Sequence, residues 1–135
     1  MQIVVDSNIL FAALIRDSMA RKVLLHLNSD FLIISVNLEE IAKYKRELLE
    51  KSNMNEISFD LLLEQLTKKC IRIKDESVKE NWEEAKKIMW DTDPKDTPFI
   101  AAALTTGADI WSDDKHFTEQ TRIKIWKTAD LAKLL

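Results

Sequence analysis

The chain has 135 residues, of which 46% are hydrophobic and 32% are charged, and its formal net charge is −3. This length and composition exclude a disordered chain and are typical of one soluble globular domain that spans residues 1–135. A single glycine excludes a glycine-rich phosphate-binding loop, no apolar run is long enough to span a membrane, and a single cysteine excludes an internal disulfide, which favours the cytoplasm.

Apolar runs alternate with helical patterns in the first half of the chain. The pattern predicts strands at residues 3–5 and 31–35 and helices at residues 8–15 and 19–27. Asn37, with Glu40 three residues later, is the predicted N-cap of a helix that runs to about Glu50. After a break at residues 51–53, a leucine-rich stretch predicts another helix, with Ser58 or Asp60 as its N-cap.

The second half of the chain continues the alternation. It predicts strands at residues 71–73, 109–112 and 123–126, and helices at residues 78–90, 99–106 and 128–135. An acidic, turn-rich stretch fills residues 91–98, and Gly107 is the predicted C-cap that ends the helix before it. Strands separated by helices indicate an α/β fold with a parallel sheet that is covered on both faces.

Four separate segments each place an acidic residue at one edge of this predicted sheet. In open parallel sheets, ligands bind beyond the carboxyl ends of the strands. One acid ends the first strand, one lies in the first turns of the helix after the second strand, one precedes the helix near residue 97, and one follows the strand that ends at residue 112. These acids are Asp6, Glu40, Asp96 and Asp114.

Two interpretations of these acids remain open at this point. A single acid at a strand end is commonly a helix cap or a solvated charge. Clustered carboxylates, however, repel by roughly 4 kcal/mol at about 4 Å and an effective dielectric near 20, so they favour protonation or a bound cation. Because His26 and His116 are isolated and there is no cysteine pair, the pattern favours Mg²⁺ or Mn²⁺ over zinc.

Three stretches, in this order and spacing, resemble the PIN domain family of metal-dependent ribonucleases. They are "IVVDSNILFAAL", "LEEIAKYKREL" and "DPKDTPFIAAALTTGADIWSDDKHF". The resemblance covers nearly the whole chain and implies a three-layer α/β/α fold with a short parallel sheet. It also implies cleavage of single-stranded RNA, often as the toxin of a toxin–antitoxin pair with a small antitoxin protein, and often as a homodimer.

The resemblance implies a four-acid metal site. Asp6, Asp96 and Asp114 would hold a principal Mg²⁺ or Mn²⁺ ion, and Glu40 would complete the site or hold a second ion and help to activate water. Ser7 and Asn8 would orient Asp6 from behind, and Ser112 stands where threonine is common in the family. Of two adjacent pairs, Glu40 is chosen over Glu39 and Asp114 over Asp113, with Asp93 as a fifth, outer acid.

Substrate binding requires local positive charge, because the net charge of the chain is negative. The basic side chains nearest the predicted acids are Lys43, Lys45, Arg46 and Lys115, and we expect them to guide an RNA backbone toward the acids.

Two other functions compete with an endoribonuclease. One is a nucleic-acid or protein-binding module that keeps the fold without turnover. The other is a receiver domain or an aspartyl-phosphate phosphatase, but a phosphatase requires a second Asp where this chain has Asn8, and the order of the acids does not fit a receiver.

Overall fold

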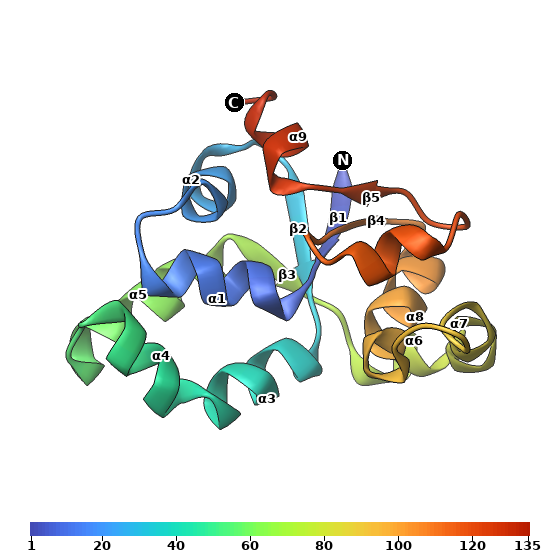
Figure 1. The fold of residues 1–135 in the computed structure, drawn as a ribbon, viewed down its shortest axis with the longest axis horizontal. Helices are drawn as coiled ribbons and strands as arrows, with labels where there is room; N and C mark the ends of the chain where they lie inside the picture. The colour runs from blue at the N-terminus through green and yellow to red at the C-terminus, as the bar shows by residue number, and fades with distance from the viewer.

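The computed structural model describes residues 1–135 and contains one sheet of five strands, ordered β3-β2-β1-β4-β5 (Figure 1). All neighbouring strands are parallel, which confirms the predicted α/β class. The strands are β1 (Gln2–Val5), β2 (Asp30–Ile33), β3 (Cys70–Arg72), β4 (Asp109–Trp111) and β5 (Ile125–Trp126).

Helices cover both faces of this sheet and complete a three-layer α/β/α architecture (Figure 1). One face carries α1 (Ser7–Ile15), α2 (Met19–His26), α3 (Ser35–Lys43), α4 (Lys45–Ser52), α5 (Glu56–Lys68) and α9 (Thr128–Ala132). The other face carries α6 (Asp75–Lys79), α7 (Trp82–Ile88), α8 (Thr97–Thr106) and the short 3-10 helices η1 (Pro94–Asp96) and η2 (Lys115–Glu119).

The alternation of side chains along each strand divides the apolar core in two. Ile3 and Val5 of β1 pack in the core beneath α1 and α2, whereas Val4 between them packs in the core beneath α8. All three are fully buried, and β4 repeats the pattern with Trp111 on one side and Ile110 on the other. Burial of both faces explains why these strands are apolar runs rather than alternating sequences.

Two helices predicted as continuous are each divided in the structure. The helix expected to run to about Glu50 stops at Lys43 and restarts at Lys45, and Tyr44 at the break packs edge-to-face on Phe11 of α1. The helix expected over residues 78–90 is α6 and α7, with a break at residues 80–81. In both cases the apolar spacing continues through the break, so the sequence pattern gives no sign of the interruption.

The predicted N-caps of α3 and α5 were wrong. Asn37 lies inside α3 rather than at its start, because Ile34 is the N-cap and its N–H donates to Asn37 Oδ1 at 2.8 Å. Helix α5 is capped by Asn55, whose side chain accepts from the N–H of Ser58 at 2.8 Å. Gly107 was predicted correctly, since it ends α8 with a left-handed φ of 72°.

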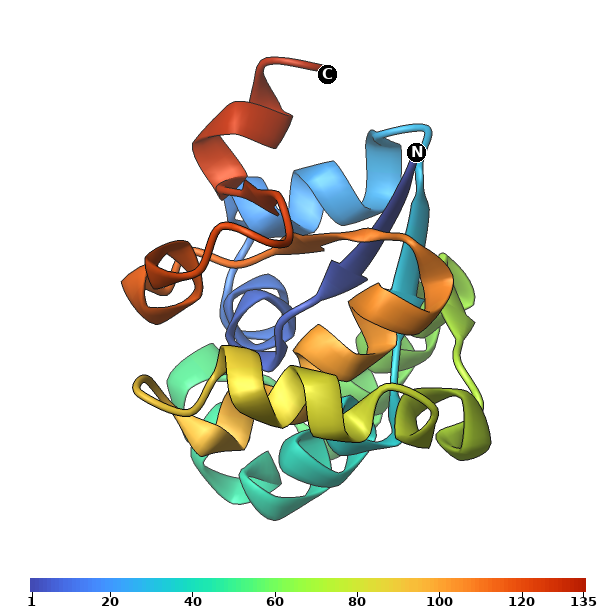
Figure 2. The same cartoon turned by 90° about the vertical axis from the view of Figure 1, so that its right-hand side faces the viewer.

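The two edges of the sheet differ in what surrounds them. Both termini lie at the amino edge, as the two perpendicular views show (Figures 1 and 2). The carboxyl edge is instead surrounded by the starts of α1, α3 and α8 and by η2. No helix of the structure is long and apolar enough to cross a membrane.

Candidate functional site

A small polar pocket of about 150 Å³ lies at the carboxyl edge of the sheet. We call it the acid pocket. The four acids singled out in the sequence all line it, although they come from four separate segments. Its lining consists of Asp6, Ser7, Asn8, Glu40, Asp93, Lys95, Asp96, Phe99 and Asp114.

Asp6 is the deepest of these acids, with only 4% of its surface exposed at the end of β1. The pKa of its carboxyl is raised to about 6, chiefly by burial and also by the charges of Asp114 and Glu40, while the hydrogen bonds from Ser112 and the backbone amide of Asn8 act in the opposite direction. Its side chain makes no hydrogen bond with the geometry of a helix cap, although Asp6 stands at the N-cap position of α1. Capping therefore does not account for a buried carboxylate at this position.

Asp96 is the least satisfied carboxylate of the pocket. Its Oδ2 atom is buried without a hydrogen-bond partner, and the side chain does not cap α8. The pKa of this carboxyl is raised to about 7, chiefly by burial and also by the charges of Asp6, Asp93 and the other pocket acids. A buried carboxylate oxygen without a partner is costly, and either protonation of the carboxyl or a bound cation would offset that cost.

Glu40 is held by a short chain of neutral hydrogen bonds. Ser7 Oγ donates to Glu40 Oε1 at 2.9 Å, and Asn37 Nδ2 donates to Ser7 Oγ at 3.1 Å and to the carbonyl of Val5 at 3.0 Å. Asn37 is fully buried, so it fastens the start of α3 to the end of β1. Ser7 was expected to orient Asp6, and that assignment was wrong, because its hydroxyl donates to Glu40 instead.

A second chain of hydrogen bonds holds Asp6 and Asp114. Ser112 Oγ donates to Asp6 Oδ2 at 2.8 Å and accepts from the backbone N–H of Asp114 at 3.0 Å. Asp114 Oδ1 in turn accepts from the N–H of His116 at 2.9 Å and caps η2. The side chain of Asn8 is exposed and makes no hydrogen bond to Asp6, so of the three predicted supporting residues only Ser112 orients Asp6 through its side chain.

The structure separates the two pairs of adjacent acids. Glu39 is exposed and lines a different pocket, whereas Glu40 faces the acid pocket. Asp113 turns toward α9, where it accepts from the N–H of Thr128 at 2.8 Å and from its hydroxyl at 2.6 Å. Glu40 and Asp114 are thus the members of each pair that line the pocket.

The donor set of the acid pocket suits a hard divalent cation. Its inward groups are carboxylates, and Mg²⁺ and Mn²⁺ prefer oxygen ligands. Burial is the main cause of the raised pKa values of Asp6 and Asp96, and it favours their neutral forms. A cation held by Asp6, Asp96 and Asp114, with Glu40 beside them, would favour the charged forms and would give Asp96 Oδ2 a partner.

One lining residue and one supporting residue had no place in the predicted ligand set. Lys95 lines the pocket through the turn before α8, and Asn37 supports it from α3. In sequence, Lys95 is one lysine among many and Asn37 resembles an ordinary cap, so neither carries a local signal. Asp93, considered as an outer acid, also lines the pocket, and its Oδ1 accepts from the N–H of Lys95 at 3.0 Å.

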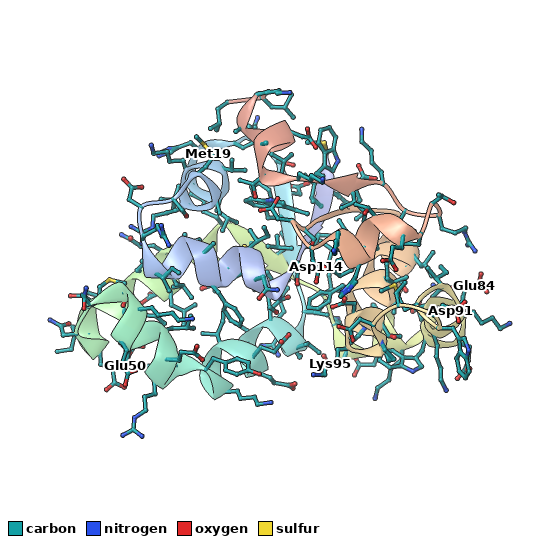
Figure 3. The ribbon with its side chains drawn as sticks, in the orientation of Figure 1. Met19, Glu50, Glu84, Asp91, Lys95 and Asp114 are labelled. Carbon is teal, nitrogen blue, oxygen red and sulfur yellow. The ribbon has the colours of Figure 1, made fainter.

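The basic residues expected to bind substrate differ in their availability. Lys43, Arg46 and Lys115 are exposed and form no salt bridge. Lys45, in contrast, pairs with Glu56 at 3.0 Å and with Asp60 at 2.9 Å, so it is occupied. In Figure 3, Asp114 and Lys95 lie near the middle of the molecule, whereas Glu50, Glu84 and Asp91 lie at its periphery.

Larger pockets lie elsewhere on the surface. One of about 520 Å³ is lined by residues of α3, α5, β2 and β3, including Leu63 and Cys70, and contains none of the four acids. A groove of about 490 Å³ between α1 and α4 adjoins the acid pocket and shares Asn8, Glu40 and Lys95 with it. Volume alone does not identify the site, because five carboxylates line the smaller acid pocket and at most two line either of these larger ones.

Comparison with known proteins agrees with this architecture. The family model described as PIN domain matches residues 4–135. No curated protein gives a significant match. Among solved structures, a chain in the "Crystal structure of VapBC2 from Rickettsia felis bound to a DNA fragment from their promoter" has a similar fold, with a TM-score of 0.70 and 16% identity over 94% of this chain and 98% of that chain.

Proposed function

Because this chain belongs to the PIN domain family, which is generally a family of nucleases, we propose that it is a metal-dependent endoribonuclease that cleaves single-stranded RNA. The observation that carries the proposal is the acid pocket, in which four segments bring carboxylates together without a pairing lysine or arginine. Helix capping does not account for Asp6 and Asp96, which stand at helix starts and cap neither helix, although Asp114 does cap η2.

The residues of the pocket would have different roles in hydrolysis. Asp6, Asp96 and Asp114 would hold a principal Mg²⁺ or Mn²⁺ ion, which supplies neutralising charge at the phosphodiester. Glu40, kept in place by Ser7, accepts the proton of the attacking water. The water oxygen bonds to phosphorus as the bond to the leaving oxygen breaks, and solvent protonates that oxygen, so no covalent intermediate forms.

Basic side chains around the pocket would receive the RNA backbone. Lys95 lines the pocket itself, and Lys115 follows Asp114 directly. Lys43 and Arg46 lie on α3 and α4 and are free of acidic partners. These positive charges offset the repulsion between an acidic pocket and a polyanion.

We further propose that the protein acts in the cytoplasm as one domain over residues 1–135, as the toxin of a toxin–antitoxin pair. The similar fold in the VapBC2 complex from Rickettsia felis supports a small antitoxin as partner. The free thiol of Cys70 agrees with a reducing compartment. We also propose that the protein forms a homodimer.

The activity is tested with purified protein and a labelled single-stranded RNA. Cleavage should require Mn²⁺ or Mg²⁺ and stop on chelation. Asp6→Asn and Asp114→Asn should retain the fold and lose most activity, and Glu40→Gln should lose about a hundredfold or more. Asp113→Asn is the matched control, because it removes a neighbouring charge that lies outside the pocket.

Two outcomes would contradict this assignment. If Asp114→Asn remains fully active while Asp113→Asn is inactive, the wrong member of the pair has been assigned to the site. If no RNA is cleaved although the folded protein binds Mn²⁺, the chain is instead a non-catalytic binding module with the same fold.

A further inference from the structure

A second group of metal-ligating side chains lies beside the four acids. One ligand atom from each of Asp93, Asp96 and His116 falls within 4.8 Å of the others. The sequence gives no sign of this cluster, because His116 lies more than one element away from the two aspartates and far from the only other histidine, His26. The fold creates it by placing η1 and η2 next to each other.

The unsatisfied atoms of the molecule point to the same place. Only two buried side-chain nitrogen or oxygen atoms lack a hydrogen-bond partner, and they are Asp96 Oδ2 and His116 Nδ1. His116 Nδ1 lies 3.3 Å from Asp114 Oδ1, but this approach does not have hydrogen-bond geometry. Buried polar atoms are usually satisfied, and both exceptions belong to residues of this one cluster.

The histidine is held in position by the core. Phe117, the next residue, is fully buried and packs edge-to-face on Phe99 of α8 with ring centroids 6.4 Å apart. The backbone N–H of His116 is fixed by Asp114 Oδ1. These contacts fasten the backbone of η2 to α8, the helix that follows Asp96, and the imidazole itself is 45% exposed.

We propose that Asp93, Asp96 and His116 form a second cation position, which takes a divalent transition-metal ion such as Zn²⁺ in preference to Mg²⁺. Imidazole nitrogen is a good ligand for Zn²⁺ and a poor one for Mg²⁺, which takes oxygen ligands. Bonds of about 2.1 Å hold two ligand atoms no more than about 4.2 Å apart, so small side-chain rotations are enough to close the cluster on one ion. Because Asp96 is shared with the principal site, the inference rests in part on the proposed function.

The test follows the two histidines of the chain by NMR. Untagged protein labelled with ¹⁵N in its histidine rings is first saturated with Mg²⁺ and then titrated with Zn²⁺. The ring nitrogens of His116 should shift with Zn²⁺ and not with Mg²⁺, and those of His26, exposed at the end of α2, serve as the internal reference.

Calorimetry measures the same site without a spectroscopic label. His116→Gln and Asp93→Asn should each weaken Zn²⁺ binding about tenfold or more. Mg²⁺ binding to His116→Gln should stay within about twofold of the parent, since the principal site uses carboxylates. His26→Gln is the matched control and should bind both ions as the parent does.

Three results would overturn the inference. The first is a His116 ring that responds to Zn²⁺ no more than His26 does. The second is an unchanged Zn²⁺ affinity in His116→Gln. The third is a His116 ring that titrates with pH but ignores Zn²⁺, which would make it an ion-pair partner of Asp114. Loss of the proposed ribonuclease activity with Zn²⁺ binding intact would instead refute the proposed function and leave this site standing.

Discussion

The acids of the acid pocket and the acids on the surface of α5 differ in whether they have a basic partner. Glu56 and Asp60 of α5 share the ammonium group of Lys45, at 3.0 and 2.9 Å. The side-chain donors to Asp6 and Glu40 are the neutral hydroxyls of Ser112 and Ser7, and Asp96 Oδ2 accepts from nothing. The molecule does contain basic side chains without acidic partners, namely Lys43, Arg46 and Lys115.

This difference separates residues that serve stability from residues that serve function. Exposed ion pairs contribute little to stability and also cost little. A buried group of like charges opposes folding unless a ligand neutralises it, and perturbed carboxylates gathered in a cleft are characteristic of functional sites. We therefore expect the pocket to lower the stability of the metal-free protein and the α4–α5 pairs to have almost no influence on it.

The largest effect should be a loss of stability of the metal-free protein as pH rises. Folding raises the pKa of Asp6 to about 6 and of Asp96 to about 7, so between about pH 4 and pH 7 the folded state holds protons that the unfolded state has released. Stability is then highest below the unfolded pKa and is lost as pH rises through the folded values. For Asp6 the loss is on the order of 2–3 kcal/mol, and partly exposed Asp96 adds less.

Urea unfolding in the presence of a chelator, at pH 5 and pH 7.5, measures this loss. Asp96→Asn removes one raised pKa without removing a hydrogen bond to Oδ2, so its pH dependence should be weaker than that of the parent. Lys45→Ala should show the pH dependence of the parent. If the free energy of unfolding changes with pH equally in the parent and in Asp96→Asn, ionisation of Asp96 in the pocket does not destabilise the metal-free protein.

A smaller loss should follow from removal of the neutral support of the pocket. Asn37→Ala leaves the carbonyl of Val5 and the N–H of Ile34 without their side-chain partner in the core. We expect a loss of roughly 1–3 kcal/mol in the free energy of unfolding, because buried groups are left unsatisfied. Asn55→Ala, which removes the exposed cap of α5, should cost roughly 0.5–2 kcal/mol and is the control for loss of an amide elsewhere.

Metal binding distinguishes these two asparagine variants. Asn37→Ala should weaken Mn²⁺ binding, since Ser7 and through it Glu40 lose their anchor, whereas Asn55→Ala should bind Mn²⁺ as the parent does. If both variants bind Mn²⁺ equally, Asn37 only stabilises the fold.

The comparison also shows which parts of the molecule a single sequence can predict. Strands buried on both faces, the α8 stop at Gly107 and the arrival of acids at one sheet edge were all predictable, because each leaves a local pattern of apolar runs, glycine or strand-end acids. The break at Tyr44 was not, because it depends on how α3 and α4 both pack on α1, with Phe11 against the tyrosine ring.

Interactions between distant segments account for the other errors. Ser112 donates to Asp6 across 106 positions of the chain, and Asn37 reaches Ser7 across 30. A capping pattern at Asn37 and Glu40 looked local, yet the structure uses both residues for the pocket. Likewise Lys45 resembles its neighbours Lys43 and Arg46 in sequence, and only the position of α5 shows that it is occupied.

The smallest expected effect concerns these basic residues. Lys43→Ala, Arg46→Ala and Lys115→Ala should each weaken RNA binding slightly and flatten the dependence of log K on log salt by about 0.7 for each phosphate that the variant no longer neutralises. Lys45→Ala should change neither the affinity nor the slope, because its ammonium is held by Glu56 and Asp60. Binding is measured with catalytically inactive Asp6→Asn protein as the common background.

If Lys45→Ala and Lys43→Ala change the slope of log K against log salt equally, the proposed difference between paired and unpaired lysines in RNA binding is wrong. A triple variant of the three unpaired residues that keeps the parental slope would show that they are only solvated.

Thermal melts with and without Mn²⁺ decide whether the acid pocket is an unneutralised cation site. Without metal, Asp6→Asn and Asp96→Asn should melt at the same temperature as the parent or higher, because each relieves repulsion. Mn²⁺ should stabilise the parent by about 2.7 kcal/mol at a hundredfold excess over its Kd and stabilise both variants much less. Asp113→Asn, which loses a cap of α9, should melt lower and keep the full response. If the parent ignores Mn²⁺ and both pocket variants melt lower, the acids are structural and the pocket is not a cation site.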